Sequence, residues 1–409
     1  MRRRGRAACG VVIVGGGLAA QRCAETLRRR GYEAPVRIVC AEAEAPYDRP
    51  PLSKDVAAGA ADSAAVRFQD AGWYADNGVE LLLDRTATGL DATARRLELG
   101  DGGSLGYDEL VIATGAAPRA LPVLAGYENA FPLRTLGDAR RLRAELCPGS
   151  HLAIVGAGFI GQEVAATARG RGVEVTLIEA LELPLAGILG AEVGRWIVNL
   201  HRDEGVRVLT GARLESARGN GRVEELRLDG GVTLGCDAVV VGIGVAPAAS
   251  WVADSGLDPA GIAIDASGRT KVSHVYAAGD VSRPFDPRLG EHVRTEHWDA
   301  ASRQGVAVAT AILGGEPRPV ALPSFWSDQY GIRVQYVGHA AGADETWVSG
   351  DPDDRDFHVL YRRGGRPVAA LTIDRPRKLA ALRQLIESDG AGNAAAADRH
   401  ESPTKEMIR

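Results

Sequence analysis

The stretch "IVGAGFIGQE" (residues 154–163) runs from apolar residues into a turn with the spacing G-x-G-x-x-G, and "VIVGGGLAA" (residues 12–20) has a similar design near the start of the chain. A buried strand that enters a glycine-rich turn and then a helix is typical of dinucleotide-binding folds, because the turn and the helix N-terminus together cradle a pyrophosphate. One such turn is weak support for a nucleotide site. Two of them in one chain predict two dinucleotide-binding units.

The first unit reads as strand, turn, helix and strand. Residues 11–14 are all apolar, as in a strand of a parallel sheet that is covered on both faces. The glycines allow the turn and the close approach of a phosphate, and a small residue at position 20 lets the helix pack tightly on the strand. The residues predicted to form this first pyrophosphate site are Gly15, Gly17, Leu18, Ala19 and Ala20.

The acceptor of the first ribose is less clear from the sequence. Gly31 is expected to end the first helix, and the strand that follows is expected to end at Val39. An acid just beyond that strand receives ribose hydroxyls in dinucleotide-binding folds. Glu42 stands close to this place, but Ala41 lies one position nearer the strand, so the acceptor stays open.

The second unit is more regular. Gly172 marks the end of its helix, and a strand leads to Glu179, about twenty residues beyond the glycines, where an acid accepts hydrogen bonds from an adenosine ribose. A carboxylate there repels a 2′-phosphate, and residues 180–190 hold a second acid and no Lys or Arg, which favours NADH over NADPH. The residues predicted to form this second turn are Gly156, Gly158, Phe159, Ile160 and Gly161.

Three later segments also read as apolar strands that enter turns of small residues: "YDELVIATGAAPR" (107–119), "CDAVVVGIGVAP" (236–247) and "HVYAAGDV" (274–281). An aspartate after glycine at a strand end is often only a turn residue. Because Asp280 stands in the context of two cofactor sites, a binding role is the favoured interpretation.

Composition and length restrict the class of protein. A chain of 409 residues exceeds one ordinary core and predicts two or three domains. A formal net charge of −5 argues against a protein that coats nucleic acid or an anionic membrane. The five cysteines are scattered without a C-x-x-C pair, which indicates reduced thiols in a cytoplasmic protein and neither a redox disulfide nor an iron–sulfur cluster. Asp, Glu and His occur singly, so no metal site is expected.

The two ends read differently from the rest of the chain. The basic start "MRRRGRAACG" (1–10) is followed by an apolar run too short for a signal peptide, and no run approaches the ~20 apolar residues of a membrane span. The last residues, "SDGAGNAAAADRHESPTKEMIR" (388–409), lack a hydrophobic period. Residues 1–7 and 391–409 are therefore expected to be disordered.

Six segments carry a resemblance to a known family, in the family's order and from about residue 10 to about residue 390. The chain resembles the ferredoxin and rubredoxin reductases of oxygenase systems, a putidaredoxin reductase-like group in the pyridine nucleotide-disulfide oxidoreductase superfamily. The motifs "PPLSK" and "FWSDQY" are more specific to this group than the glycine turns. The segments are "PYDRPPLSK" (46–54), "ATGAAPR" (113–119), "GFIGQEVAATA" (158–168), "YAAGDV" (276–281), "EHWDAA" (296–301) and "FWSDQYGIRVQYVG" (325–338).

The resemblance implies an α/β fold with two Rossmann-like dinucleotide-binding domains, arranged as in glutathione reductase, and a small α+β C-terminal domain. It places an FAD-binding domain at 8–117 and 246–318, an NAD-binding domain at 118–245 and the C-terminal domain at 319–390. It also implies electron transfer from NADH through FAD to a ferredoxin or rubredoxin, and indirectly to an oxygenase. The protein would be a monomer or weak dimer that binds neither nucleic acid nor membrane.

The family's site residues transfer to matching positions of this chain. Arg49 and Lys54 would lie beside the flavin, Ala87 would meet the adenine through its backbone, and Trp298 would offer its backbone N–H to the pyrimidine edge. Gly242 and Gly244 would border the nicotinamide. The remaining implied FAD contacts are Ala113, Thr114, Gly115, Arg134, Asp280, Glu296 and His297.

The implied chemistry explains the need for two nucleotides. NADH gives up two electrons together as hydride, an iron–sulfur protein accepts one at a time, and a flavin does both. Lys54, paired with Glu163, would stabilise negative charge on the reduced flavin. The alternative is that the two form a surface ion pair worth about 0–1 kcal/mol.

The chain departs from the family pattern at two positions. Ala41 stands where some relatives have an acid for the FAD ribose, and Gly187 where relatives often have a basic residue near the adenosine of the nicotinamide cofactor. These departures affect the details of ribose recognition and NADH affinity.

The C-terminal domain is expected to begin near "LPSFWSDQYGIRVQYVGHA". Residues 332–338 alternate as in a half-exposed strand, residues 357–373 form a hairpin around Gly364–Gly365, and residues 376–388 form an amphipathic helix. Trp326 would cover the flavin or fill a core, and the resemblance favours the flavin. Basic residues that could meet an acidic ferredoxin, or simply be solvated, are Arg362, Arg363 and Arg366.

Two other functions remain open. One is a flavoprotein that passes electrons from NADH to a small acceptor such as a quinone, a radical or oxygen. The other is a redox sensor that binds both nucleotides but turns over slowly. The cofactor motifs alone do not separate these from a ferredoxin reductase.

Overall fold

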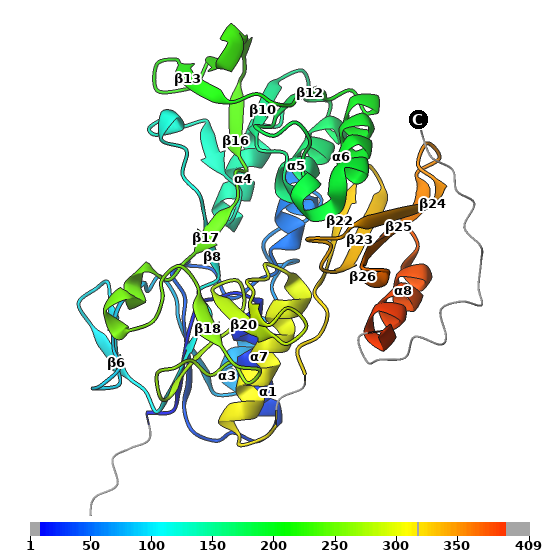
Figure 1. Ribbon diagram of the computed structural model, residues 1–409. Helices are drawn as coiled ribbons and strands as arrows, with labels where there is room; N and C mark the ends of the chain where they lie inside the picture. The colour runs from blue at the N-terminus through cyan, green and yellow to red at the C-terminus, as the bar shows by residue number, and fades with distance from the viewer. Residues whose placement is uncertain (1–8, 317–318, 390–409) are drawn as a thin grey trace, which may run out of the picture. The chain divides into compact units, whose positions relative to one another are not determined.

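The computed structural model describes residues 9–316 and 319–389, which divide into two compact units (Figure 1). Each unit contains one of the two glycine-rich turns. Residues 1–7 and 391–409, which the sequence predicts to be disordered, lie outside the described residues. Unit 1 takes in the described residues of Met1–Arg119, Arg134–Arg140 and Gly244–Ala321, and unit 2 those of Ala120–Leu133, Arg141–Ile243 and Leu322–Arg409.

Unit 1 is built on a parallel sheet with the strand order β3-β2-β1-β7-β19. The central strand is the predicted apolar stretch, Val11–Val14, and its side chains are at most 2% exposed. It pairs with β2 on one side and β7 on the other, which explains why every position is apolar. The strands are β1 Val11–Val14, β2 Val36–Val39, β3 Val79–Leu82, β7 Glu109–Ile112 and β19 Val275–Ala277.

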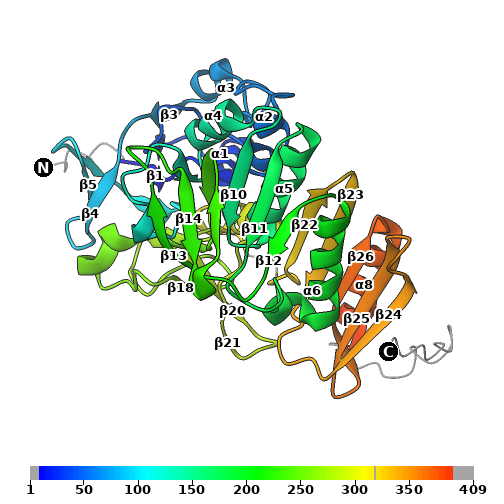
Figure 2. The same ribbon diagram turned by 90° about the horizontal axis from the view of Figure 1, so that it is seen from above.

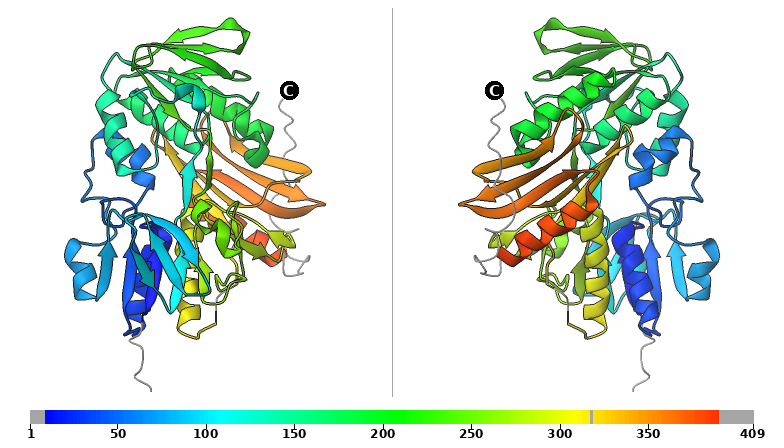
Figure 3. Two further views of the ribbon diagram at one scale, coloured as in Figure 1. Left: turned by 90° about the vertical axis from the view of Figure 1, so that its left-hand side faces the viewer. Right: turned by 90° about the vertical axis from the view of Figure 1, so that its right-hand side faces the viewer.

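Two helices, α1 (Leu18–Arg29) and α7 (Trp298–Ile312), lie side by side in unit 1 (Figure 3). Their close approach depends on Gly305, because a Cβ there would lie 2.3 Å from the carbonyl oxygen of Ala19. Gly31 has a φ of +81° just beyond the end of α1, so the predicted helix stop is confirmed.

Smaller elements complete unit 1. Strands β8 and β17 pair with each other, while β4-β5-β6 and β18-β20-β21 form two further sheets. Short helical segments are α2 Asp55–Ala58, α3 Ala71–Asp76 and the 3₁₀ turns Pro50–Ser53 and Ser250–Ser255. The strands are β4 Ala87–Asp91, β5 Arg96–Leu99, β6 Ser104–Gly106, β8 Ala116–Pro118, β17 Val245–Pro247, β18 Ile262–Ile264, β20 Ser282–Asp286 and β21 Glu291–His292.

Unit 2 contains a second parallel sheet with the order β12-β11-β10-β16-β9, in which β10 is followed along the chain by α5 and β11 by α6 (Figure 2). The strand expected to end at Glu179 ends one residue earlier, so that the glutamate follows the sheet directly. The elements are β9 Ala130–Pro132, β10 His151–Val155, α5 Phe159–Gly170, β11 Glu174–Ile178, α6 Ala186–Asp203, β12 Arg207–Leu209, β13 Leu214–Arg218, β14 Glu225–Leu228, β15 Thr233–Gly235 and β16 Ala238–Val241. Helix α4 spans Leu136–Glu145, and 3₁₀ turns span Pro122–Leu124 and Asp229–Gly231.

The end of the chain adds an antiparallel sheet to unit 2, with α6 on one face and α8 on the other (Figure 3). Strand β23 is half-exposed at its start, as predicted, because Val334 and Tyr336 pack toward α6 while Arg333 is exposed, but further along Val337 packs toward α8. The predicted hairpin turns at Gly364–Gly365. The elements are β22 Ser324–Gln329, β23 Ile332–Gly338, β24 Glu345–Asp351, β25 Asp356–Arg363, β26 Arg366–Ile373 and α8 Pro376–Asp389.

The fold class predicted from the sequence is confirmed in each unit. Both units have a parallel sheet in which one strand leads into a glycine turn and a helix, and residues 324–389 form an α+β segment. The finer division into three domains stays a prediction. Within the described residues, no helix is both long and apolar enough to cross a membrane.

Candidate functional site

The first glycine turn, in unit 1, has the shape that a pyrophosphate needs. Gly15 has a φ of +122°, and a Cβ on it would lie 2.1 Å from the carbonyl oxygen of Ala113. A Cβ on Gly17 would meet nothing within 4 Å, so the turn is closed on one side and open on the other. Gly17 caps α1 without a side-chain hydrogen bond to the first N–H groups of the helix. These N–H groups and the open side fit a bound phosphate.

Charged residues of unit 1 gather near this turn. Arg134 Nη2 donates to Asp280 Oδ2 at 3.1 Å, and Arg49 Nη1 donates to the carbonyl oxygen of Arg134 at 2.5 Å. Desolvation and the neighbouring Arg49 lower the pKa of Arg134, while Asp280 raises it. Thr114 Oγ1 is buried and has no hydrogen-bond partner among the described residues. Two adjacent guanidinium groups and an unpartnered hydroxyl fit a polar, anionic ligand such as the predicted FAD.

Glu42, the candidate ribose acceptor, is engaged with its own segment. Its carboxylate accepts hydrogen bonds from the hydroxyl of Tyr47 at 2.5 Å and from Arg49 Nη2 at 3.0 Å. The Tyr47 hydroxyl in turn accepts the N–H of Leu136 at 3.1 Å. Glu42 therefore holds the "PYDRPPLSK" segment in place, and its contact with a ribose stays a prediction.

Asp48 is a residue of this region that sequence reasoning missed. Its Oδ1 accepts a hydrogen bond of 2.8 Å from the indole of Trp298, the first residue of α7. Burial raises the pKa of the Asp48 carboxyl, and the bond from Trp298 opposes this. Asp48 lies inside a quoted motif, but nothing in the sequence shows that its partner is a tryptophan far along the chain.

The other residues of unit 1 that are predicted to bind a cofactor are described by their contacts and elements within that unit. Lys54 Nζ donates to the carbonyl oxygen of Pro50 at 3.1 Å, and Arg294 pairs with Glu296 at 2.7 Å. Ala87 begins β4, His297 is the N-cap of α7, and Gly244 accepts the N–H of Arg119 at 2.9 Å. Their predicted contacts with FAD or nicotinamide stay predictions, as does that of Gly115, the residue after Thr114.

The second turn, in unit 2, is closed by three glycines. A Cβ on Gly156, whose φ is +104°, would lie 2.3 Å from the carbonyl oxygen of Gly242. A Cβ on Gly161 would lie 2.2 Å from that of Gly156. Gly158 caps α5 without a side-chain hydrogen bond, which leaves the N-terminus of that helix available to a phosphate.

Glu179 is fixed at the end of β11 by two backbone groups. Its Oε2 accepts the N–H of Ala157 at 2.8 Å, and its Oε1 accepts that of Leu181 at 2.9 Å. The carboxylate therefore lies next to the glycine turn, where a ribose would be bound and a 2′-phosphate repelled. This is the geometry that the spacing of the residues predicts.

Glu163, on α5, is 7% exposed and accepts a hydrogen bond of 2.8 Å from the hydroxyl of Ser327 on β22. Beside it, Gln162 accepts one of 3.0 Å from Gln329. The predicted pair of Glu163 with Lys54 joins residues of different units and stays a prediction. Ser327 and Gln329 were missed, although they alternate with Trp326 and so fall on one face of a strand.

Aromatic and apolar residues surround this turn within unit 2. The rings of Phe159 and Phe325 lie 4.5 Å apart, and Ile160 is 38% exposed. Trp326 is half-buried on β22, and its predicted contact with the flavin stays a prediction. Among the residues that the structure describes, no group of three or more His, Cys, Asp and Glu side chains is placed to hold a metal ion.

Comparisons with known proteins agree with this picture. The family model described as pyridine nucleotide-disulphide oxidoreductase matches residues 10–305, and the model described as reductase C-terminal matches residues 324–408. The chain is 41% identical to the anthranilate 1,2-dioxygenase system ferredoxin–NAD(+) reductase component of Burkholderia cepacia, over 92% of this chain and 93% of that protein. It is 35% identical to putidaredoxin reductase CamA of Pseudomonas putida, over 92% and 91% of the two chains.

Solved structures agree as well. The covalent putidaredoxin reductase–putidaredoxin complex contains a chain that superposes with a TM-score of 0.90 at 34% identity, covering 93% of each chain. The ferredoxin reductase of the CYP199A2 system from Rhodopseudomonas palustris gives a TM-score of 0.88 at 33% identity, covering 93% of this chain and 95% of that one.

Proposed function

The chain belongs to the pyridine nucleotide-disulphide oxidoreductase family, and on that basis we propose that it is an FAD-containing ferredoxin reductase that takes electrons from NADH. Its acceptor is a ferredoxin or rubredoxin, a one-electron iron–sulfur carrier that serves an oxygenase. The names of the relatives support this acceptor, since they are reductase components of such systems. The match of residues 324–408 to the family model described as reductase C-terminal also supports this acceptor.

The observation that carries the proposal is the presence of two complete dinucleotide turns with different surroundings. In unit 1 the turn lies with Arg49, Arg134 and an unpartnered Thr114 hydroxyl, which suits a tightly held FAD. In unit 2 the turn lies beside Glu179, which suits an unphosphorylated ribose and so NADH. The unit 1 site is assigned to FAD and the unit 2 site to NADH.

The residues of the chain bind and orient, and none needs to act as a general base. A bound FAD would supply the chemistry that accepts a hydride and releases electrons one at a time. The free N–H groups of α1 and α5 hold the two pyrophosphates, and Asp280 holds Arg134 in place. Trp298, whose indole is bonded to Asp48, would offer its backbone N–H at the start of α7 to the pyrimidine edge of the flavin. Lys54, whose pairing with Glu163 stays a prediction, would stabilise negative charge there.

The three-domain division of the sequence, with FAD at 8–117 and 246–318, NAD at 118–245 and the C-terminal domain at 319–390, is part of this proposal. So is a cytoplasmic location, which the five free cysteines, Cys9, Cys23, Cys40, Cys147 and Cys236, support because none of them forms a disulfide with another.

Anaerobic stopped-flow mixing of the purified protein with NADH, and separately with NADPH, tests the proposal. We expect the visible absorbance of the flavin to bleach rapidly with NADH and at least about tenfold more slowly with NADPH, because Glu179 repels a 2′-phosphate. A colourless protein, or a flavin that neither nucleotide reduces, contradicts the proposal and favours a sensor. Rapid bleaching without transfer to any ferredoxin or rubredoxin favours a small-molecule acceptor.

A further inference from the structure

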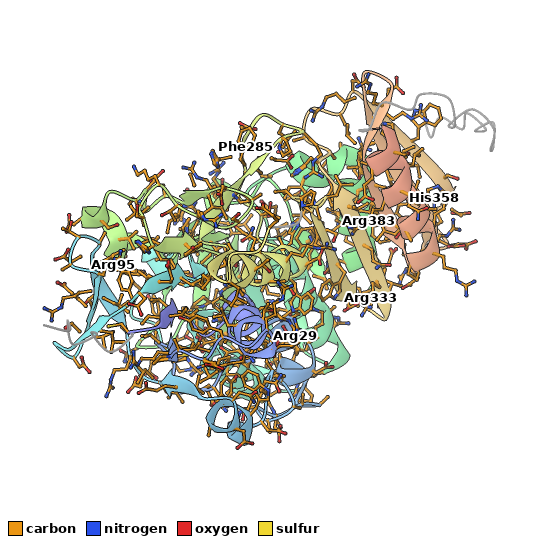
Figure 4. All side chains as sticks on the ribbon, turned by 90° about the horizontal axis from the view of Figure 1, so that it is seen from below. Arg29, Arg95, Phe285, Arg333, His358 and Arg383 are labelled. Carbon is orange, nitrogen blue, oxygen red and sulfur yellow. The ribbon has the colours of Figure 1, made fainter. Side chains whose placement is uncertain are left out.

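Strand β22 presents alternate side chains to helix α5. Ser327 and Gln329 are 0% and 3% exposed and face α5, whereas Asp328 between them forms an ion pair of 2.6 Å with Arg333 on the other side of the strand (Arg333 is labelled in Figure 4). Their partners on α5 are Gln162 and Glu163, which are 0% and 7% exposed. Because these four side chains are shielded from water, the hydrogen bonds between them fix their relative positions.

One branch of this contact leads to the glycine turn. Gln329 Nε2 donates to Gln162 Oε1 at 3.0 Å, and Gln162 Nε2 donates to the carbonyl oxygen of Ala157 at 2.7 Å. The N–H of Ala157 is bound by Glu179 at 2.8 Å. Ala157 lies between two glycines of the turn, so its backbone is fixed from both sides by side chains.

The other branch leads to the carboxylate of Glu163. Gln329 Nε2 also lies 3.1 Å from Ser327 Oγ, which donates to Glu163 Oε1 at 2.8 Å. The Ser327 hydroxyl accepts one bond and donates another, and so gives the carboxylate of Glu163 a single orientation.

Side chains on either side of these contacts hold the strand against its neighbours. The ring of Phe325 lies 4.5 Å from that of Phe159 and 4.9 Å from that of Tyr336. At the hairpin turn after β22, the hydroxyl of Tyr330 lies 2.7 Å from Nδ1 of the buried His201 on α6. Aromatic packing on one end and this hydrogen bond on the other keep Ser327 and Gln329 in register with α5.

We propose that Ser327 and Gln329, contributed by the C-terminal segment, are positioning residues of the NADH site. Gln329, through Gln162, holds the turn that receives the pyrophosphate. Ser327 orients Glu163, the acid predicted to act with Lys54 on the reduced flavin. The inference rests on the proposed function, because it takes NADH as the ligand of the unit 2 turn.

The two branches predict different defects, which a truncated ligand separates. ADP-ribose carries the pyrophosphate but no nicotinamide, and NAD⁺ carries both. Calorimetric titration of the holoenzyme with each ligand, for the wild type, Gln329→Leu, Ser327→Ala and Asp328→Asn, measures the Gln329 branch independently of turnover. Stopped-flow reduction of the flavin at saturating NADH measures the Ser327 branch. Asp328→Asn changes the neighbouring residue on the outer face and is the matched control.

We expect Gln329→Leu to bind both ADP-ribose and NAD⁺ about fivefold more weakly, since it leaves Gln162 Oε1 buried without its donor. We expect Ser327→Ala to bind ADP-ribose within about twofold of the wild type but to slow flavin reduction at saturating NADH several-fold. Asp328→Asn should change neither. Gln329→Met removes the same donor with a flexible side chain and replaces Gln329→Leu if that variant does not fold.

Two results overturn the inference. One is a Gln329 variant, folded by circular dichroism, that binds ADP-ribose as the wild type does. The other is an Asp328→Asn protein that loses as much affinity as Gln329→Leu, which would mean that any change in β22 has this effect. Failure of the proposed function is a separate result, because then the wild-type flavin is not reduced by NADH at all.

Discussion

His201 shows how a single buried residue makes stability depend on pH. It is 0% exposed, its Nδ1 lies 2.7 Å from the Tyr330 hydroxyl, and burial lowers its pKa from 6.5 to about 4. Above pH 6.5 the imidazole is neutral in both the folded and the unfolded chain. Between pH 6.5 and 4 only the unfolded chain takes up the proton, so the free energy of unfolding falls as the pH is lowered.

The expected loss between pH 7 and 4 is about 3 kcal/mol from this residue, at ~1.4 kcal/mol for each pH unit between the two pKa values. His201→Asn, which keeps a group able to bond Tyr330, should be less stable at pH 7 but should lose less stability on acidification. Denaturant titrations of both proteins across this pH range measure the two slopes. Equal slopes would show that His201 is not the source of the pH dependence of the free energy of unfolding.

Residues differ in how far their roles can be predicted from sequence. The glycines of both turns were predicted because their spacing reports a backbone shape, and the positive φ of Gly15 and Gly156 agrees. Asp48, Ser327 and Gln329 were not predicted as site residues. Their partners are chosen by the tertiary fold, and a short polar side chain in a strand has the same local pattern whether it faces a helix or water.

At the scale of elements, the contact between α1 and α7 depends on one glycine. Gly305→Ala would place a Cβ 2.3 Å from the carbonyl oxygen of Ala19, so the two helices must separate. We expect a loss of about 1–3 kcal/mol in the free energy of unfolding, together with weaker retention of FAD, whose pyrophosphate we propose to bind at the start of α1. Thermal unfolding and the flavin content of the purified protein measure both effects.

The matched control for this prediction is Gly187→Ala. Gly187 is also helical, in α6, but a Cβ on it would meet nothing within 4 Å. Alanine there should leave stability unchanged or raise it slightly, because it has the higher helix propensity. If Gly305→Ala and Gly187→Ala unfold alike, the close packing of α1 and α7 does not limit stability.

The sequence predicted the bounds of helices and strands more closely than the burial of their side chains. The strands at 11–14 and 332–338 and the helix at 376–388 lie where alternation or helical periodicity indicated. The prediction that β23 is half-exposed holds at Arg333 but not at Val337, because alternation shows that one face is apolar but not that a second helix, α8, covers part of the other.

On the scale of the whole molecule, the C-terminal segment covers an apolar face of unit 2. Leu189, Val193 and Ile197 of α6 are at most 3% exposed and pack against the sheet of β22 to β26. A protein that ends at residue 321 uncovers these side chains. We expect it to aggregate or bind a hydrophobic dye and to lose NAD⁺ affinity, whereas unit 1 keeps the residues assigned to FAD.

Gel filtration, dye binding and calorimetry against the full chain measure these outcomes. A monodisperse truncated protein with unchanged NAD⁺ affinity would contradict the prediction. The fold class at this scale was predictable from two motifs and their order. The joining of the last segment to unit 2 was not, because it rests on the apolar face of α6 and on four buried polar side chains rather than on any motif.

The hydrogen bonds between β22 and α5 also limit how relatives of this chain can be recombined. A graft that replaces residues 322–389 alone brings a foreign strand against the resident Gln162 and Glu163. Any mismatch leaves a buried amide or carboxylate without its hydrogen-bond partner on β22. A crossover placed before β10 transfers α5 and β22 together. In a library of shuffled relatives, we therefore expect the folded proteins to inherit these four side chains together as one block.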